Sequence, residues 1–427
     1  MPDESPLTPA AGVGTRRRLD HIDAMRPVKQ VGVVSTHTLL FFAPLAAAVT
    51  VGASLQLLHV TREAFLFVSA CMLTYSVRDL PGIDHRTFWR RRFSLVAVPY
   101  VCWSVIYFVV TIRSAPGTVG GDALHLLYLV GTGYYQLYYL LVLLEFYALF
   151  PLCLILVRRT VGHHGLLLLA SGAAQVALVS AMHWGLAPGW MTGYWATREV
   201  TSYQFYLIAG MVMALHLDEF HRWLCTHVWT IVTATVAAAV VAEAWYYLSV
   251  DHVMSWLGSS ADPFQPVVIP FNIGAIACIY LIGVALVDRR RSRRLRRAVH
   301  SGSDNSYGVY LAQLLFITVL SWLGWEHLNG VLPWPVVSAL TVVVVFAACL
   351  GLTELLARTP WAKPLTGRSR VPWRAERPAA AAADPAPGVV PAGPGVAAPA
   401  AVVAAVGPGL AGGDAPVASR VEALSPT

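Results

Sequence analysis

An arginine and a histidine stand eleven residues apart in the stretch RPVKQVGVVSTH, residues 26–37, at the start of the first long apolar run. Eleven residues of a continuous α-helix turn through about 1100°, so Arg26 and His37 would share one face, about 16 Å apart along the axis. A histidine can take a proton from a hydroxyl group near neutral pH, and an arginine can bind a phosphate or carboxylate through two hydrogen bonds. The alternative is an arginine that reaches the membrane surface and a core histidine that is hydrogen-bonded to another helix.

Further polar residues continue this helical face. Lys29 and Thr36 lie on rows next to Arg26 and His37, with Val33 between them. Ionisable side chains inside a bilayer are costly, and they usually face a cavity or a partner. The stripe therefore predicts a water-accessible cavity beside this helix.

Three consecutive arginines, Arg90, Arg91 and Arg92, precede the apolar stretch FSLVAVPYVCWSVIYF. Basic residues at the end of a span commonly anchor its cytoplasmic side. They could also hold a polyphosphate group that reaches the membrane from the cytoplasm, because arginine and phosphate form strong charge-assisted hydrogen bonds. The sequence leaves both interpretations open.

Polar groups also occur in the span GTGYYQLYYLLVLLEFYALFPL, residues 131–152. Gln136 lies near its outer end and Glu145 lies deep within it, and Glu243 is a second acid inside an apolar run. A carboxylate in the membrane should face a cavity or a cationic partner. Gln136 and Glu145 are therefore candidate substrate-binding or donor-binding residues, although a buried glutamate can equally clamp a neighbouring helix.

The late stretch SDNSYGVYLAQLLF, residues 303–316, predicts another span with Asp304, Asn305 or Ser306 as its helix cap. Tyr307, Tyr310 and Gln313 follow at intervals of three along one face. For these three side chains we favour a packing stripe.

Composition places these residues in a membrane. Hydrophobic residues make up 56% of the chain, charged residues 12%, and the mean hydropathy is +0.59, whereas about 25% of a soluble domain is charged. We therefore expect a multi-pass integral protein of the cell membrane, in contact with the lipid bilayer. The net charge of +7 does not indicate nucleic-acid binding, because the basic residues fall in connections between apolar runs. The six cysteines occur singly and predict neither a disulfide framework nor a zinc site.

The apolar runs predict an all-α protein with about ten transmembrane helices, since a span needs about 20 apolar residues. The expected spans cover residues 28–50, 61–77, 93–112, 134–157, 164–183, 202–217, 227–249, 267–287, 307–324 and 334–357. Residues 122–131 form a weaker run that is suited to an interfacial or re-entrant segment.

The basic residues give an independent test of this topology. All Lys and Arg residues except Arg62, Arg113 and Arg198 fall on alternate connections or at the two ends of the chain. Cytoplasmic loops carry such an excess of Lys and Arg. The pattern predicts that both termini are cytoplasmic.

The ends of the chain differ from the part between them. Residues 1–18 lack the apolar core of a signal peptide and are expected to form a flexible cytoplasmic leader. Residues 377–427 are rich in Ala, Pro and Gly, which predicts a disordered cytoplasmic tail. The functional domain should therefore occupy residues 19–360.

Together these motifs resemble acyltransferase family 3, a family of integral membrane acyltransferases. Members begin with an arginine and a histidine at the spacing of Arg26 and His37, and continue with a Phe-rich segment and a basic loop that leads into a Pro-Tyr span. FLFVSACMLTYS (65–76) and FWRRRFSLVAVPY (88–100) occupy those places, and LYYLLVLLEFYALFPL and SYGVYL follow in the expected order. The resemblance covers roughly residues 19–360.

The chain departs from the family pattern at three points. Ser69-Ala70 stands where the family has Ser-Gly. Glu145 replaces a glutamine in the LLEFY segment and does not correspond to the acidic pair of some members. Gln313 stands where a histidine is common.

The resemblance implies transfer of an acyl group, often acetyl, from acyl-CoA to a hydroxyl group of an acceptor such as an envelope glycan, a lipid-linked sugar or a secreted metabolite. It implies that His37 and Arg26 are catalytic. His37 would act as base on the acceptor hydroxyl or as relay for the acyl group, and Arg26 would position the donor or stabilise the developing charge. Arg90, Arg91 and Arg92 would hold the phosphates of CoA. No bound cofactor is expected, since acyl-CoA is a co-substrate.

A transporter is the main alternative. Its substrate would be a glycan or small molecule, and His37, Glu145 and Glu243 would form a proton relay. The sequence shows no repeat symmetry and no pair of spans broken by Gly or Pro, both of which many transporters have.

Overall fold

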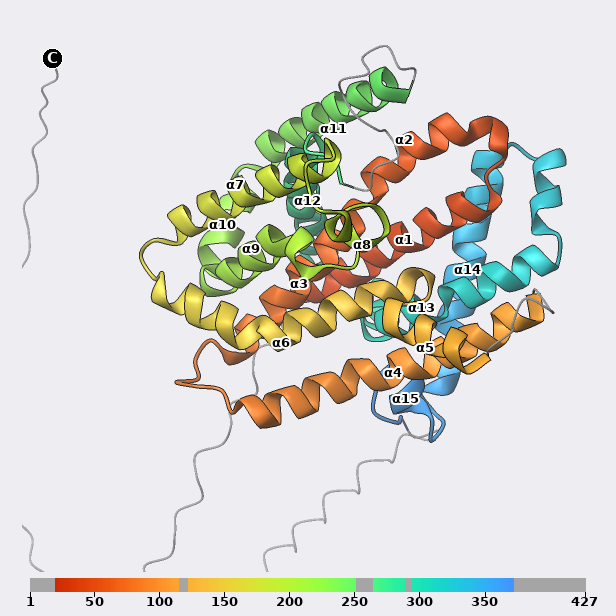
Figure 1. The fold of residues 1–427 in the computed structure, drawn as a ribbon, viewed down its shortest axis with the longest axis horizontal. Coiled ribbons are helices and arrows are strands. Elements are labelled where there is room, and N and C mark those ends of the chain that lie inside the picture. Colours follow the sequence, from red (N-terminus) through yellow and green to blue (C-terminus); the bar gives the residue numbers. More distant parts are fainter. Residues whose placement is uncertain (1–19, 115–121, 251–263, 289–292, 372–427) are drawn as a thin grey trace, which may run out of the picture. The chain divides into compact units, whose positions relative to one another are not determined.

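A computed structural model describes residues 20–114, 122–250, 264–288 and 293–371, all of which belong to one unit of the chain, Met1–Trp373. Every regular element in these ranges is a helix (Figure 1). The predicted leader, residues 1–18, and the predicted tail, residues 377–427, lie outside the described residues.

Fifteen α-helices make up the described residues. They are α1 (Asp20–Phe42), α2 (Ala48–Leu58), α3 (Val60–Val77), α4 (His85–Ser114), α5 (Asp122–Thr132), α6 (Tyr138–Arg159), α7 (His164–His183), α8 (Gly193–Ala196), α9 (Gln204–Leu215), α10 (Leu217–Thr226), α11 (Val228–Val250), α12 (Val268–Asp288), α13 (Arg293–Trp322), α14 (Trp334–Leu356) and α15 (Ala362–Thr366). Short 3₁₀ turns join several of them: η1 (Leu45–Ala47), η2 (Tyr135–Leu137), η3 (Gly189–Met191), η4 (Val200–Tyr203) and η6 (Trp325–Gly330).

Seven helical segments in the described ranges are long and apolar enough to cross a membrane, or eight if the bent pair α9 and α10 is one span. They are Leu45–Val77, His85–Val110, Tyr135–Arg159, His164–His183, Val228–Val250, Val268–Val287 and Trp334–Leu356. The all-α membrane architecture is thus confirmed, whereas ten spans remain a prediction. The expected spans 28–50 and 307–324 fall on α1 and α13, which carry charged residues in their first halves.

Three predicted boundaries were wrong. α1 ends at Phe42, and most of the expected outer loop after residue 50 is the helix α2. α13 begins at Arg293, so Asp304, Asn305 and Ser306 lie inside a helix and do not cap it. The reason is that the helix continues through the basic segment RRLRR, which sequence analysis treated as a loop.

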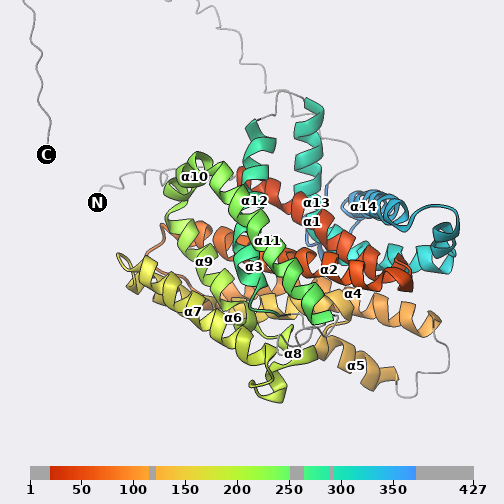
Figure 2. The same ribbon diagram turned by 90° about the horizontal axis from the view of Figure 1, so that it is seen from above.

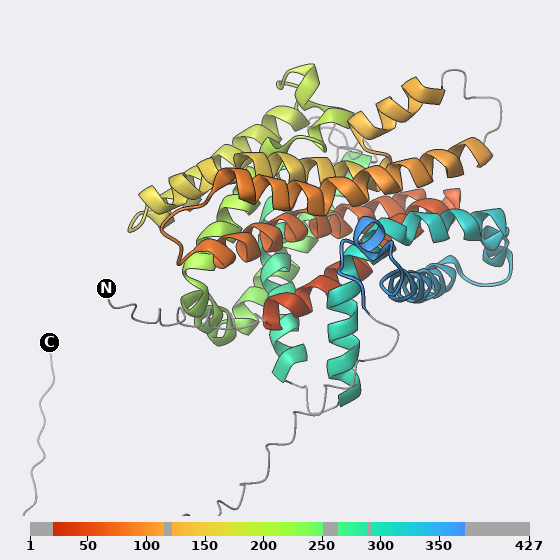
Figure 3. The ribbon, with the colours of Figure 1, turned by 90° about the horizontal axis from the view of Figure 1, so that it is seen from below.

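α1 lies at the centre of the bundle and packs against α3, α12, α13 and α14 (Figures 1 and 2). α4 and α6 lie side by side, and the short helix α15 packs against α4, α13 and α14 (Figure 3). Large buried side chains fill the centre, including Trp103 and Tyr107 of α4 and Phe146 and Phe150 of α6. This core fixes the polar face of α1 against the neighbouring helices.

The packing of α3 along α9 depends on a close approach at Gly210. A Cβ atom on Gly210 would overlap the carbonyl oxygen of Phe67 and lie 3.2 Å from the Cβ of Ala70. Small residues let helix backbones approach in this way inside membranes. Gly210 therefore brings α9 against the helix that carries Phe65 and Arg62.

We expect Gly210→Ala to lower the free energy of unfolding by about 1–3 kcal/mol, because the added methyl group must push apart two backbones. Gly351→Ala is the matched control: Gly351 also lies inside a helix, but a Cβ there meets no atom within 4 Å. The control should be neutral or gain up to about 1 kcal/mol from helix propensity. Thermal unfolding in nanodiscs, followed by circular dichroism, compares the two, and equal melting temperatures would contradict the close-packing argument.

Candidate functional site

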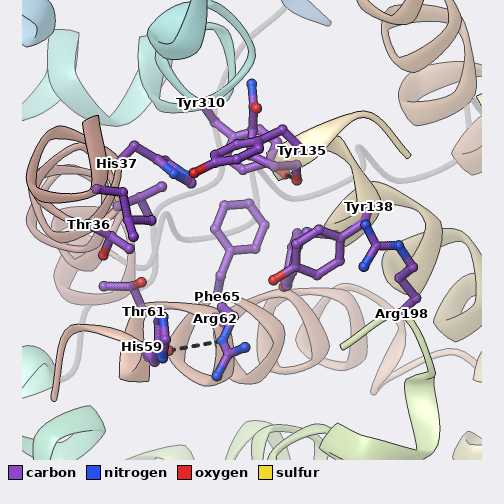
Figure 4. A pocket seen from close by; sticks show the side chains of 14 residues that line it. Thr36, His37, His59, Thr61, Arg62, Phe65, Tyr135, Tyr138, Arg198 and Tyr310 are labelled. Atoms are coloured by element: carbon purple, nitrogen blue, oxygen red, sulfur yellow. Dashed lines mark hydrogen bonds between the residues drawn. The ribbon is translucent and has the colours of Figure 1, made fainter. Parts of the chain in front are cut away.

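A cavity of about 290 Å³, hereafter the His37 chamber, lies beside the C-terminal half of α1 (Figure 4). Its walls come from α1, α3, α6, α13 and the turns between helices. They consist of Val33, Thr36, His37, Leu40, His59, Thr61, Arg62, Phe65, Tyr135, Gln136, Tyr138, Tyr139, Arg198 and Tyr310. Phe65 and four tyrosines supply aromatic surface, so the chamber combines two histidines and two arginines with a largely apolar wall.

His37 faces a strained tyrosine across this chamber. The imidazole and the ring of Tyr135 have centroids 5.4 Å apart, and Phe41 packs edge-on against the same tyrosine. Nδ1 of His37 is buried and finds no hydrogen-bond partner among the described residues. Tyr135 has a φ of 42°, a conformation that costs a non-glycine residue of order 1–3 kcal/mol and is enriched at functional sites.

Gln136 is held in the wall by contacts to two other helices. Its Nε2 donates a hydrogen bond to the hydroxyl of Tyr107 at 3.2 Å, and that hydroxyl donates to the carbonyl of Leu311 at 2.5 Å. The carbonyl of Gln136 accepts a hydrogen bond from the hydroxyl of Tyr310. The network fixes the turn before α6 against α4 and α13, and so fixes Tyr135 over His37.

Two arginines on the predicted outer side line the same chamber. Nε of Arg62 donates to the carbonyl of His59 at 3.4 Å, and its guanidinium lies 3.6 Å from the carboxylate of Glu63. Nε of Arg198 donates to the carbonyl of Thr132 at 2.9 Å. Both guanidinium groups are thus anchored to backbone carbonyls at the chamber wall.

A larger cavity of about 420 Å³, hereafter the basic chamber, adjoins the N-terminal half of α1. Four cationic side chains, Arg26, Lys29, Arg92 and Arg368, line it. The remaining lining residues are Phe65, Val68, Ser69, Met72, Leu73, Ser76, Leu95, Val96, Leu143, Tyr147, Ser306, Tyr307, Thr366 and Gly367. None of the lining residues is acidic, so the chamber favours a polyanion.

The cations of α1 have different environments. The guanidinium of Arg26 is about one-third exposed and lies 3.5 Å from the carboxylate of Asp23, one helical turn earlier. Lys29 is only 3% exposed, and its Nζ lies 4.2 Å from the centre of the Phe65 ring. The aromatic face stabilises this buried ammonium.

Arg368 reaches the basic chamber from the segment after the last apolar helix. Gly367, with a φ of 67°, ends α15 in the left-handed conformation and turns the chain toward the chamber. The Arg368 guanidinium donates to Oδ1 of Asn305, and Nδ2 of Asn305 donates to the Glu354 carboxylate at 2.7 Å. This chain of hydrogen bonds holds Arg368 against α13 and α14.

Phe65 lies between the two chambers and lines both of them. Its ring packs edge-on against Tyr139, with centroids 5.1 Å apart, and lies 6.1 Å from the ring of Tyr310. In Figure 4 it points into the centre of the His37 chamber. A flexible chain that enters from the basic chamber would reach His37 by passing this ring.

The structure places the predicted pair on one continuous helix, as the helix geometry requires. α1 is continuous from Arg26 to His37, and the two residues line adjoining chambers. Arg92 lines the basic chamber, whereas Arg90 and Arg91 are exposed at the start of α4 and are not among the lining residues.

The two candidates from α6 and its preceding turn are placed apart. Gln136 lines the His37 chamber, but Glu145 accepts a hydrogen bond from the backbone N–H of Val200 at 2.9 Å and lines neither chamber. Tyr310 and Tyr307, which were expected to pack, do so in the hydrophobic core, and they also line the His37 chamber and the basic chamber respectively.

Tyr135 and Arg368 were not among the residues predicted from the sequence, where Arg62 and Arg198 served only as topology markers. The two arginines had a usable signal, since they are two of only three basic residues on the predicted outer side. In the described ranges no cluster of three or more His, Cys, Asp or Glu residues is suited to a metal ion.

Comparison with known proteins gives one match. A family model described as an acyltransferase domain matches residues 19–353, which include all of the lining residues named above except Thr366, Gly367 and Arg368. No curated protein and no solved structure matches the chain.

The contact of Glu145 predicts a structural effect of its replacement. Glu145→Leu leaves the N–H of Val200 unpaired at the start of η4 and should lower the free energy of unfolding by about 1–3 kcal/mol. Glu145→Gln keeps an acceptor oxygen and should lose less. Melting temperatures of both variants in nanodiscs test this order, and a Glu145→Leu variant as stable as the wild type would refute it.

Proposed function

The chain belongs to the family defined by this acyltransferase domain, and it is a membrane acyltransferase; on this premise we propose that it transfers an acyl group from cytoplasmic acyl-CoA to a hydroxyl group of its acceptor. The observation that carries the proposal is the pair of adjoining chambers, one with four cations and one with His37, which meet at Phe65. The acyl group proposed first is acetyl. The acceptor is an envelope glycan, a lipid-linked sugar or a secreted metabolite.

The basic chamber would bind the phosphate groups of the donor. A polyphosphate cannot enter hydrocarbon, and Arg26, Arg92 and Arg368 can each form charge-assisted hydrogen bonds to phosphate oxygens. The thioester arm would then pass Lys29 and Phe65 toward His37. Arg90 and Arg91, exposed at the start of α4, would contribute only a screened attraction.

His37 would act as the general base. The neutral imidazole accepts the proton of the acceptor hydroxyl while the oxygen attacks the thioester carbonyl. The C–O bond forms, the C–S bond breaks, and the imidazolium returns its proton to the departing CoA sulfur. The hydroxyl of Tyr139 is buried in this chamber without a hydrogen-bond partner among the described residues, and it would donate to the oxyanion of the tetrahedral intermediate.

The proposal includes an orientation in the membrane. Ten spans with both termini cytoplasmic would place Arg26, Arg92 and Arg368 on the cytoplasmic side, and Arg62 and Arg198 on the outer side. The donor and the acceptor would therefore approach His37 from opposite sides of the cell membrane.

The role of His37 is tested by the release of CoA from radiolabelled acetyl-CoA by the purified protein in nanodiscs. His37→Gln should lower the rate by about 10²–10⁴-fold, the usual contribution of general acid–base catalysis. His163→Gln, which changes an exposed histidine that lines neither chamber, should keep the wild-type rate. Equal rates for His37→Gln and the wild type would exclude His37 as the base.

A wild-type protein that releases no CoA from acetyl-CoA or longer acyl-CoA esters, even with cell-extract acceptors, would overturn the donor proposal. Uptake of labelled substrate into vesicles without any acyl donor would then identify a transporter.

The role of Arg368 is tested by a pair of neighbouring arginines. Arg368→Gln removes a charged hydrogen bond to phosphate, worth roughly 1.5–3 kcal/mol, and should raise the KM for acyl-CoA by about 10–100-fold with little change in kcat. Arg370→Gln is the control, since the exposed Arg370 bonds only to the carbonyl of Arg358, at 3.3 Å, among the contacts described. An unchanged KM for Arg368→Gln would remove this residue from the donor site.

A further inference from the structure

A third cavity has a volume of about 270 Å³. His59 and Arg62 line both this cavity and the His37 chamber, and they form the boundary between the two. We call it the amide chamber, because Gln56, Gln175, Gln265 and Asn272 line it together with Glu63. These side chains come from α2, α3, α7, α12 and the segment just before α12. Neither the family match nor the proposed catalytic steps assign a role to this cavity.

Its polar residues are deeply buried, which costs free energy unless their donors and acceptors form hydrogen bonds. Gln56 is 8% exposed, Glu63 2% and Asn272 4%. Leaving a buried polar atom unpaired costs about 1–3 kcal/mol in a folded protein. Three such sites around one cavity of this size therefore indicate a purpose other than packing.

The unpaired atoms are all hydrogen-bond acceptors. Nε2 of Gln56 donates to the carbonyl of Ala242 at 2.9 Å, and Nδ2 of Asn272 donates to the hydroxyl of Tyr206 at 3.3 Å. Their oxygens, Oε1 and Oδ1, and Oε2 of Glu63 are buried and find no partner within the described part of the chain. The donors of these side chains are thus engaged, and their acceptors remain available.

A ligand that fits such a lining must supply several hydrogen-bond donors. An anion would be repelled by these oxygens. A cation is disfavoured because Arg62 already lies 3.6 Å from Glu63. Hydroxyl groups meet the requirement without a charge, and the rings of Tyr246 and Phe264 offer apolar surfaces for the face of a carbohydrate ring.

We propose that the amide chamber is a binding site for a polyhydroxylated ring of the acceptor, with Gln56, Glu63 and Asn272 accepting hydrogen bonds from its hydroxyl groups. The proposal rests on the proposed transferase function and locates the acceptor. A ring bound there would lie next to His59 and Arg62, so an attached hydroxyl-bearing unit can extend into the His37 chamber. The volume, near the lower end of the roughly 300–1,000 Å³ range of ligand pockets, suits a single sugar ring.

Because this chamber shares no lining residue with the basic chamber, donor and acceptor would bind independently. The three cavities follow one another, since the His37 chamber shares Phe65 with the basic chamber and His59 and Arg62 with the amide chamber. The reacting groups can meet only at His37. Specificity for the acceptor would accordingly reside in residues that take no part in the acyl-transfer steps.

The test measures binding directly and without a donor. The methyl α-glycosides of glucose, mannose and galactose are titrated against the wild-type protein in nanodiscs free of sugar detergents, and saturation-transfer NMR reports binding. Tetrahydropyran, the same ring without hydroxyl groups, is the negative probe. We expect at least one glycoside to bind and tetrahydropyran not to compete with it.

Variants then locate the site. Gln56→Leu and Asn272→Leu should each weaken glycoside binding tenfold or more, equivalent to at least about 1.4 kcal/mol. Asn329→Leu is the matched control, because Asn329 lines none of the three chambers. Its Nδ2 likewise donates to a backbone carbonyl, that of Phe42, at 2.7 Å. Its Oδ1 is also an unpaired acceptor among the described residues. Thermal melting establishes whether each variant folds. If only one of the two chamber variants folds, that variant alone is enough for the test.

No binding of any of the three glycosides to the wild type, or undiminished binding to a folded chamber variant, would overturn the assignment of the amide chamber. Release of CoA by the wild type distinguishes this failure from failure of the transferase proposal. CoA release without glycoside binding would refute the chamber alone. Chamber-dependent glycoside binding without CoA release would leave a sugar site in a protein whose donor chemistry was wrongly proposed.

Discussion

The arrangement of the helices around α1 depends on one constraint: the ionisable side chains of α1 must not face lipid. Lys29 is nearly completely buried, and Arg26 and His37 follow the same helical face. A charge exposed to hydrocarbon costs several kcal/mol, so this helix is stable only when other helices enclose it. α3, α12, α13 and α14 do so, and the His37 chamber and the basic chamber lie beside its polar residues. Met25 and Val34 of α1 lie in the core, whereas Val31, Leu40 and Phe41 are exposed. A segment that hydropathy does not rank among the membrane spans therefore becomes the centre of the bundle.

Phe65 determines how the two chambers beside α1 are separated. By standing between the basic chamber and the His37 chamber, it separates the region suited to phosphate from the region suited to proton transfer. Its contacts with Lys29, Tyr139 and Tyr310 tie that position to α1, α6 and α13. In the proposed reaction, an aromatic partition of this kind would admit a thin thioester arm while limiting water, which would otherwise compete with the acceptor for the acyl group. On the proposed acceptor side, Arg62 and His59 form the corresponding boundary with the amide chamber.

Hydrogen bonds between segments far apart in the chain fix the helices around the chambers. Asn305 connects Arg368 to Glu354, and the indole N–H of Trp103 donates to the carbonyl of Leu365 at 2.9 Å, which fixes the segment after the last apolar helix against α4. Glu145 of α6 likewise fixes η4, because its carboxylate accepts a hydrogen bond from the backbone N–H of Val200. Inside a membrane such bonds are rarely exchanged for bonds to water, so each restricts the relative positions of helices. The strained backbone of Tyr135 persists because Gln136, the next residue, is held on both sides.

The sequence by itself determined the all-α membrane class, most apolar helices, and the common face of Arg26 and His37, because each follows from local composition or from the fixed rotation per residue of a helix. It also identified Arg92 and Gln136 as candidates. Only the tertiary structure decided that Glu145 bonds to Val200, that Tyr307 and Tyr310 reach cavities, and that α13 extends back to Arg293. Only the tertiary structure brought Arg368 to the basic chamber, and only it placed Gln56, Glu63 and Asn272 around the amide chamber. These outcomes depend on which helices become neighbours. A helical period specifies the face on which a side chain lies, but not what that face meets.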